Sequence, residues 1–345
     1  MEEGGRFSHS MALDDYDKFM MGLSAESDEF ARQFPVHCLC PGCLEIPINS
    51  HSQQYRGALQ VIAKHKKVYA PSKDRAWFLK RLMEGKHPSG RLHAVEIKRA
   101  SIFKGFCAKH DIELFRAIET RPLIKGDEEQ VLAFHRRAVA FEALSKFKML
   151  VWLRAHGSAL KCYGMCPENW DEQFNVQKIL LRADFDYDWH PLWDANPMAS
   201  IDYAWRVIPK KILVSMASSI PAISEKQIVE YTDRHIDLKA NRMDCPRPGF
   251  TLTIVPQEHE THVIMVWSRM NSPLVELWRE RMLSEDKGVL EKFLNECVFC
   301  KSEDYCIGPA EWDMVSPAVR RIVEDDLPTD DFRTEEQVVP NIIRL

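Results

Sequence analysis

The chain has 345 residues, of which 45% are hydrophobic and 28% are charged, values that are ordinary for a soluble globular protein with two or three domains. It contains no run of about 18 apolar residues, so we expect no membrane-spanning helix and no membrane partner. The acidic start of the sequence lacks the basic and apolar segments of a secretory signal. Together with ten cysteines, this predicts a reducing, cytoplasmic location.

The net charge of −5 is unevenly distributed along the chain. Residues 54–110 contain 14 Lys and Arg against three acidic residues, so the remainder is strongly acidic. A basic block inside an acidic protein creates a local positive field, which favours a polyanionic partner such as DNA or RNA. Solvated helix faces are also often rich in lysine, so the charge alone leaves both interpretations open.

The first half of the chain is predicted to combine helices with loop-rich segments. One or two short helices are expected over residues 12–34, and another over 53–65. Residues 66–105 are interrupted by proline and glycine, which predicts short elements joined by loops. A long, buried helix is predicted over 127–155, since acidic residues stand at its N-terminal end and Gly157 follows it.

The second half is predicted to contain most of the β-structure. Residues 205–217 are rich in β-branched and other apolar residues, which favour a strand. Residues 249–268 predict a hairpin that turns near 256–260, and helices are expected over 272–284 and 286–297. The predicted fold class is therefore α+β, with a sheet that contains this hairpin.

Two close pairs of residues offer the four ligands of a tetrahedral zinc site: Cys40 with Cys43, and Cys107 with His110. Gly42 permits the tight turn that would aim the first two sulfurs at one point. The second pair stands at the start of a predicted helix over 110–119, and zinc held between a knuckle and a helix N-terminus is the geometry of a treble clef. Cys38 is the alternative to Cys40 as first ligand. Structural zinc is the predicted cofactor.

These patterns divide the chain into four expected regions: an N-terminal helical segment (1–36), a helical and treble-clef zinc module with a basic insertion and the long helix (37–157), an α+β domain of unknown role (158–327) and an acidic tail (328–345).

Three segments together resemble the HNH, or ββα-metal, endonucleases: C-x2-C at 40–43, INSH at 48–51 and FKGFC-x2-HD at 103–111. In that family a zinc knuckle often precedes a β-hairpin with the general-base histidine, and the residue after the second zinc pair binds the catalytic divalent ion. The resemblance implies that His51 is the base and that Asp111 binds Mg²⁺ or Mn²⁺. Ser50 stands where an Asp or His commonly assists the metal. The pattern is also similar to that of uncharacterised bacterial proteins, some of them near phage-defence genes.

The chemistry of phosphodiester hydrolysis is consistent with these residue types. The reaction requires an activated water and a cation that neutralises charge on the departing oxygen. A neutral histidine accepts a proton near pH 7, and a carboxylate holds a hard ion such as Mg²⁺. Two features depart from the family pattern: residues 52–106 form a longer insertion than a compact HNH motif has, and residues 91–106 contain no Asn.

The leading hypothesis is therefore a zinc-stabilised nuclease that hydrolyses nucleic acid, in a defence or toxin setting. The alternative is a non-catalytic zinc module that binds nucleic acid, or that binds a protein partner through residues 158–327. The chain contains no glycine-rich phosphate-binding loop of the dinucleotide or Walker type, so no nucleotide cofactor is expected.

Three other segments contain clustered ionisable residues. Residues 182–194 alternate aspartates with aromatics, so on a strand the carboxylates would share one face. Such a face could bind a divalent ion, but a solvated face over aromatic packing is the preferred interpretation. Residues 258–262 are expected at an exposed hairpin tip, with His259 and His262 in solvent. A third group offers no clear fourth metal ligand and predicts buried, reduced thiols: Cys297, Cys300 and Cys306.

Overall fold

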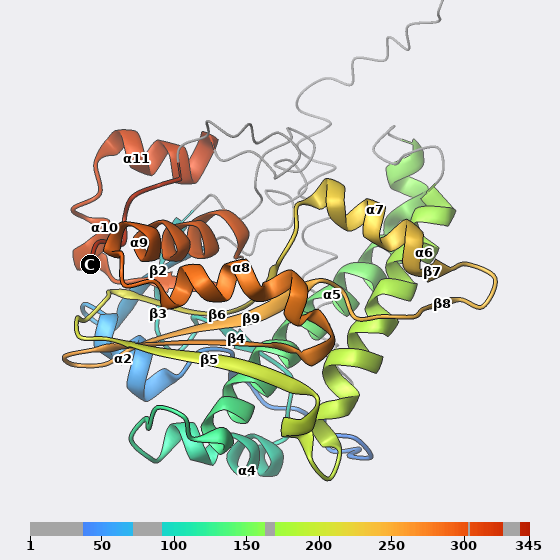
Figure 1. The fold of residues 1–345 in the computed structure, drawn as a ribbon, viewed down its shortest axis with the longest axis horizontal. Coiled ribbons are helices and arrows are strands. Elements are labelled where there is room, and N and C mark those ends of the chain that lie inside the picture. The colour runs from blue at the N-terminus through green and yellow to red at the C-terminus, as the bar shows by residue number, and fades with distance from the viewer. Residues whose placement is uncertain (1–36, 72–91, 163–169, 303, 327–338) are drawn as a thin grey trace, which may run out of the picture.

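The computed structural model describes residues 37–71, 92–162, 170–302, 304–326 and 339–345 (Figure 1). The helices expected over residues 12–34 lie outside the described residues, as does most of the expected acidic tail. Within the described part, the fold is mixed α+β, as the sequence predicts.

A seven-stranded sheet, antiparallel at every pairing, forms the centre of the molecule, with the strand order β3-β2-β11-β6-β9-β10-β5. Its strands are β2 (Lys67–Pro71), β3 (Leu92–Glu96), β5 (Ile201–Ile208), β6 (Val214–Pro221), β9 (Gly249–Pro256), β10 (Thr261–Ser268) and β11 (Tyr305–Ile307). The basic segment contributes β2 and β3, so one sheet contains strands from both sides of residue 157. This long-range pairing is not visible in local sequence patterns.

The predicted hairpin is confirmed, because β9 and β10 pair over their length and the chain turns at residues 257–260. Both faces of these strands are buried. Phe250, Leu252 and Ile254 point into one core, whereas Thr251 and Thr253 point to the other face. The expected strand over 205–217 is instead split between β5 and β6. Pro209 separates them, and proline cannot donate a hydrogen bond within a sheet.

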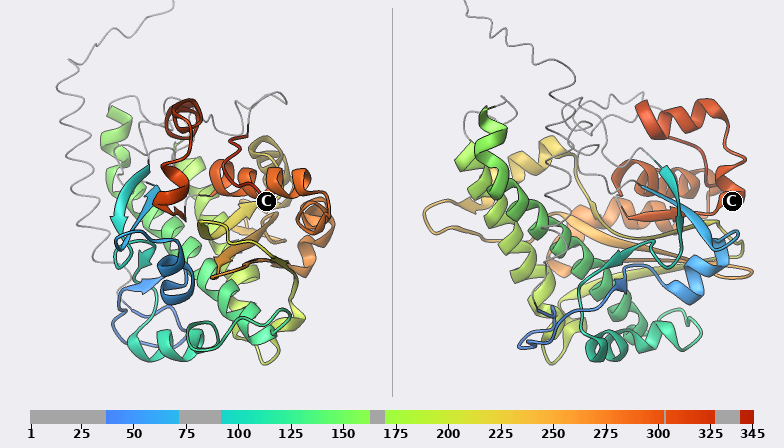
Figure 2. Two further views of the ribbon diagram at one scale, coloured as in Figure 1. Left: turned by 90° about the vertical axis from the view of Figure 1, so that its left-hand side faces the viewer. Right: turned by 180° about the vertical axis from the view of Figure 1, so that it is seen from behind.

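Helices cover the two faces of the sheet (Figures 1 and 2). Helix α5 (Glu128–Cys162) crosses one face, where it packs on β6, β9 and β10. Helix α8 (Ser272–Leu283) packs on β5, β9 and β10 from the other side, and α9 (Lys287–Asn295) packs against α8. The helices predicted over 272–284 and 286–297 are thus confirmed.

Helix α5 is longer than the sequence predicts, since it continues through the buried Gly157 to Cys162. A glycine in a helix interior costs about 1 kcal/mol relative to alanine. Helix α6 (Trp170–Ala183) packs along α5, and tertiary packing of this kind outweighs a single unfavourable propensity.

A smaller unit is formed by segments on either side of β2 and β3 in the chain. Strands β1 (Ser50–His51) and β4 (Ile102–Phe103) pair antiparallel, and α4 (Ala108–Glu119) follows β4. The helix expected over 53–65 is reduced to a π-helical turn, Tyr55–Leu59, and one α-helical turn, Gln60–Ile62. Helix α4 packs against α5, so the β1–β4–α4 unit rests on the same helix that covers the sheet.

The remaining bounds complete the fold: π-helical turns at Asp184–Trp189, Glu296–Cys300 and Ile322–Asp326, 3₁₀ turns at His190–Trp193, Pro197–Ala199 and Arg269–Asn271, helices α7 (Glu225–His235), α10 (Pro309–Trp312) and α11 (Pro317–Arg321), and a two-stranded ribbon of β7 (Ile236–Asp237) and β8 (Arg242–Met243).

The aspartate-rich segment, residues 182–194, is helical, so its carboxylates do not line one face of a strand. Asp184 is buried and pairs with Lys146 at 3.1 Å and with Arg247 at 3.3 Å. The preferred solvated face is therefore wrong for Asp184, because two cations compensate its charge inside the protein.

Candidate functional site

Four side chains from the two cysteine segments converge on one point, with their ligand atoms all within 4.8 Å of one another: Cys38, Cys43, Cys107 and His110. Nδ1 of His110 lies 3.4 Å from the sulfur of Cys38 and 3.3 Å from that of Cys107. The sulfurs of Cys43 and Cys107 are 3.9 Å apart, too far for a disulfide. The group can hold a metal ion.

Cys38 stands in this group in place of Cys40, which corrects the expected first ligand. The backbone explains the exchange. The N–H of Cys40 points at the sulfur of Cys38, 3.5 Å away, and the N–H of Cys43 donates to the carbonyl of Cys40 at 3.0 Å. Cys40 therefore supports the first sulfur through its main chain, and the turn at Gly42, with φ of 75°, brings Cys43 back to the group.

Backbone hydrogen bonds join the two cysteine segments. The N–H of Leu39 donates to Gly105 and that of Ile48 to Phe106, both at 2.8 Å. Cys107 is the residue immediately before α4, so His110 lies in the first turn of that helix. Main-chain hydrogen bonds between the two segments thus help to hold the four ligand side chains together.

The electrostatics of the group fit a bound cation. Burial raises the pKa of Cys38 to about 12, because a buried thiolate without a compensating charge is unfavourable. A backbone hydrogen bond at His110 lowers the pKa of Cys107. Soft thiolates with one imidazole are a donor set that suits a closed tetrahedral zinc site.

His51 lies on β1, opposite Ile102 of β4. Its Nδ1 is 2.9 Å from the carbonyl oxygen of Ala100 and 3.4 Å from the hydroxyl of Ser101. A carbonyl only accepts, so this contact places the proton on Nδ1 and leaves Nε2 as the basic nitrogen. Within the described part of the chain, Nε2 has no hydrogen-bond partner. The ring is half-buried and packs at 5.0 Å from the ring of Tyr55.

Burial lowers the pKa of His51, and the bond to Ala100 partly offsets this effect. Arg137 lowers the same pKa further, whereas the carboxylates of Glu119 and Asp111 raise it. These three charges therefore lie within electrostatic reach of the imidazole. Asp111 contributes to the electrostatic environment of His51, after Arg137 and Glu119.

Glu119 and Arg137 were not indicated by the sequence patterns. Arg137 has 3% of its side chain exposed, forms a 2.8 Å ion pair with Glu119, and stacks over the ring of Phe115 at 4.2 Å. A signal did exist, since Arg137 is a charged residue between apolar positions of α5, next to Ala138 and three residues after Phe134. Such a residue is retained where a partner compensates it.

Ser50 is not placed with His51. Successive strand residues point to opposite faces, and Ser50 is 2% exposed. Its hydroxyl is buried, and among the described residues it has no hydrogen-bond partner. Ser50, which the resemblance places beside the catalytic ion, is thus turned into the core.

The described part of the basic segment presents exposed cations around β2 and β3. Lys64 and Lys66 precede β2 and Lys67 begins it, and all three are exposed. The N–H of Ile97 donates to the carbonyl of Lys66 at 3.0 Å, which places these lysines beside the end of β3. Lys98 and Arg99 are also exposed and directly precede Ala100, the residue that anchors the His51 ring. Lys98 forms an exposed 2.9 Å ion pair with Glu96.

The other ionisable clusters have structural explanations. His262 is 3% exposed and not at a solvated tip, because its Nδ1 accepts from the indole of Trp205 at 3.0 Å and its Nε2 contacts Glu260 at 3.0 Å. His259 is exposed in the turn, as expected. The three clustered thiols of the second half are buried and are not disulfide-bonded, which confirms that prediction: Cys297, Cys300 and Cys306.

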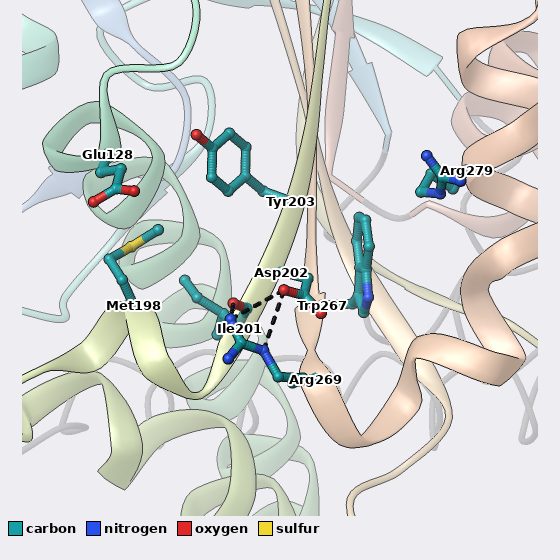
Figure 3. Close-up of a pocket in the computed structure, with 8 residues that line it drawn as sticks. All are labelled: Glu128, Met198, Ile201, Asp202, Tyr203, Trp267, Arg269 and Arg279. Carbon is teal, nitrogen blue, oxygen red and sulfur yellow. Dashed lines mark hydrogen bonds and ion pairs between the residues drawn. The ribbon is translucent and has the colours of Figure 1, made fainter.

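A separate hollow lies between the start of α5, edge strand β5 and α8 (Figure 3). Tyr203 and Glu128 border it on one side of the strands, and Trp267 and Arg279 on the other. At its centre Arg269 forms a 3.1 Å ion pair with Asp202. None of the predicted site residues lines it.

Comparisons with family models, curated proteins and solved structures find no match to this chain. None of the helices in the described residues combines the length and apolar character needed to cross a membrane.

Proposed function

We propose that this protein is a zinc-stabilised, divalent-metal-dependent nuclease of the HNH type, which hydrolyses phosphodiester bonds in nucleic acid. The observation that carries the proposal is the contact between Nδ1 of His51 and the carbonyl of Ala100, 2.9 Å long, on a strand pair that leads directly into α4. This contact orients the imidazole and leaves Nε2 able to accept a proton from water.

Asp111 is the proposed ligand of the catalytic ion. It follows His110 in the first turn of α4, and its carboxylate is half-buried and acts electrostatically on His51. Carboxylate oxygen suits Mg²⁺ or Mn²⁺. Such an ion, when bound, supplies positive charge against the departing oxygen. Glu119, which also acts on this imidazole, is already paired with the buried Arg137 at 2.8 Å, so Asp111 is the carboxylate that we assign to the ion.

Zinc has a structural role in this proposal. The Cys38, Cys43, Cys107 and His110 group lies where the chain that precedes β1 meets the first turn of α4. An ion bound there would hold the strand of His51 and the helix of Asp111 in register. Sub-ångström placement of two catalytic groups requires such support.

Exposed cations are available to bind the phosphate backbone. Lys98 and Arg99 adjoin the residue that anchors His51, and Lys64, Lys66 and Lys67 extend the positive surface. Phosphate contacts of this type give affinity that falls steeply with salt and is independent of base sequence. The proposed substrate is therefore nucleic acid, with DNA and RNA both to be tested.

The test uses purified full-length protein with supercoiled DNA, single-stranded DNA and RNA, each with Mg²⁺ or Mn²⁺. Cleavage is expected, and His51→Ala should reduce it about 100-fold or more, the usual contribution of a general base. His259→Ala is a matched control, because it removes an exposed imidazole from the turn between β9 and β10, outside the proposed site. It should retain full activity.

A second pair of variants tests the ion ligand. Asp111→Asn should abolish metal-dependent cleavage, whereas Glu113→Gln, which removes an exposed carboxylate from the same turn, should not. Equal cleavage by wild type and His51→Ala would refute the role of His51. Salt-sensitive binding without cleavage in either metal would support the alternative, a non-catalytic nucleic-acid-binding module.

A further inference from the structure

We propose that His235, Asp244 and Cys245 form a second metal site, which takes a zinc-like divalent transition-metal ion. Nδ1 of His235 lies 3.0 Å from Oδ1 of Asp244, and these atoms and the sulfur of Cys245 all lie within 4.8 Å of one another. The site involves none of the residues of the proposed nuclease and does not rest on that function.

Local folding explains why these residues meet. Helix α7 ends at His235, and β7 and β8 form a short ribbon in which Ile236 pairs with Met243. Extending this register by one residue in each strand brings His235 beside Asp244, and the N–H of Asp244 contacts the carbonyl of His235 at 3.3 Å. The ribbon thus returns the chain to the end of the helix.

The turn of the ribbon is itself stabilised. The carboxylate of Asp237 accepts hydrogen bonds from the N–H groups of Lys239 at 3.0 Å and Ala240 at 2.9 Å. Asn241 then adopts a φ of 52°, a left-handed conformation that asparagine tolerates. The metal-ligand atoms are therefore presented by an ordered loop.

Packing behind the site holds it in place. The ring of Tyr231 packs on His235 with 4.5 Å between centroids, and its hydroxyl donates to the carbonyl of Pro246 at 3.3 Å. Met243 is buried against α6, and the hydroxyl of Tyr187 donates to its carbonyl. These contacts hold the main chain on both sides of Asp244 and Cys245.

The donor chemistry indicates the kind of ion. Imidazole nitrogen, carboxylate oxygen and thiolate sulfur together select zinc or a similar borderline ion over Mg²⁺ or Ca²⁺. Three protein ligands leave one position of a tetrahedral site to water. The side chains of His235 and Asp244 are 36% and 67% exposed, so an ion can enter from solvent. A bound ion would link the ribbon to the end of α7.

A surface pair elsewhere offers a matched control. His190 Nδ1 lies 3.4 Å from Asp186 Oδ1, but this pair is not part of a three-donor group in the described structure. If a His–Asp pair alone explained the arrangement at His235, the two positions would behave alike toward zinc. If the thiol completes a metal site, only the His235 position will bind an ion.

The experiment measures zinc per chain in full-length protein that has been equilibrated with excess Zn²⁺ and then freed of unbound metal. His235→Asn and Cys245→Ser should each carry one ion fewer than wild type, and His190→Asn the same number as wild type. Equal zinc content in wild type, His235→Asn and Cys245→Ser would overturn the proposal.

A second measurement detects the thiolate of Cys245 as a ligand. Excess Co²⁺ is added to wild type, Cys245→Ser and His190→Asn. The intensity of the thiolate-to-cobalt charge-transfer band per chain should fall in Cys245→Ser, which removes one thiolate ligand, and should be unchanged in His190→Asn. Circular dichroism checks that each variant is folded. Equal band intensity in folded wild type and folded Cys245→Ser would count against the site.

Discussion

The hydroxyl of Ser52 donates a 2.5 Å hydrogen bond to Oδ2 of Asp304, a residue 252 positions later in the chain. Ser52 directly follows β1, and Asp304 directly precedes β11 of the large sheet. Both side chains are buried, with 1% and 4% exposure. The amide of Gln53 also contacts Asp304 at 3.4 Å. The strand that carries His51 is therefore anchored to the C-terminal part of the fold.

This anchor predicts a stability difference between two neighbouring serines. Ser52→Ala should reduce the free energy of unfolding by about 1–3 kcal/mol, because it leaves a buried carboxylate without one of its donors. Ser50→Ala is the matched control, since Ser50 is equally buried but its hydroxyl has no partner among the described residues. Its cost should be close to zero. Urea unfolding followed by circular dichroism measures both, and equal losses would contradict the anchor.

The group of Cys38, Cys43, Cys107 and His110 predicts that three cysteine-to-serine variants will differ in bound metal. Cys38→Ser and Cys107→Ser should each lose one bound ion, whereas Cys40→Ser should retain it, because only the main chain of Cys40 supports the group. Loss of the ion should also lower the melting temperature, since metal binding free energy is folding free energy. Metal analysis by mass spectrometry gives the comparison. Metal loss in Cys40→Ser with retention in Cys38→Ser would restore Cys40 as the ligand.

The environment of His51 predicts the pH dependence of the proposed cleavage. Burial lowers the pKa of His51 below its ordinary 6.5, so the imidazole is neutral and able to act as a base at pH 7. The plot of kcat/KM against pH should therefore be level from neutrality upward and fall on the acidic side, with a midpoint below 6.5. Added imidazole should partly rescue His51→Ala. A midpoint above 6.5 would mean that another group controls the rate.

His135 predicts a pH dependence of stability that is separate from function. It is buried on α5 with Nδ1 2.8 Å from the hydroxyl of Thr251, and burial lowers its pKa to about 3. Above pH 6.5 the imidazole of His135 is neutral in both the folded and the unfolded chain, so its contribution to the free energy of unfolding is fully present. As pH falls from 6.5 towards 3, only the unfolded chain binds the proton, and stability falls by up to about 1.4 kcal/mol per pH unit.

The measurement is denaturant unfolding of wild type and His135→Gln at several pH values between 7 and 4. The variant should be less stable at pH 7, because a buried hydrogen bond is altered, but its stability should decline less on acidification. His259→Gln, which removes an exposed imidazole, should follow the wild-type pH dependence. Parallel curves for wild type and His135→Gln would show that His135 does not contribute.

Local sequence patterns predicted one hairpin, three helices and three of the four ligands in the first metal group. The composition of residues 249–268 and the turn expected near 256–260 predicted the β9–β10 hairpin, and acidic residues at the N-terminal end of 127–155 predicted most of α5. The helices expected over 272–284 and 286–297 correspond to α8 and α9. Spacing also identified Cys43, Cys107 and His110, because ligands three positions apart can converge on one ion wherever the chain goes. The resemblance indicated His51 and Asp111 as catalytic residues, and these roles remain predictions.

Contacts between distant parts of the chain decided the rest. The choice of Cys38 over Cys40 depends on where a backbone N–H points, and the Ser52–Asp304 bond joins residues 252 positions apart. The pairing of β2 with β11 and the approach of Arg137 to Glu119 are equally non-local. Periodicity and spacing report which face of an element is apolar and which ligands can share an ion. They do not report which distant surface covers that face, because that follows from the packing of the whole chain.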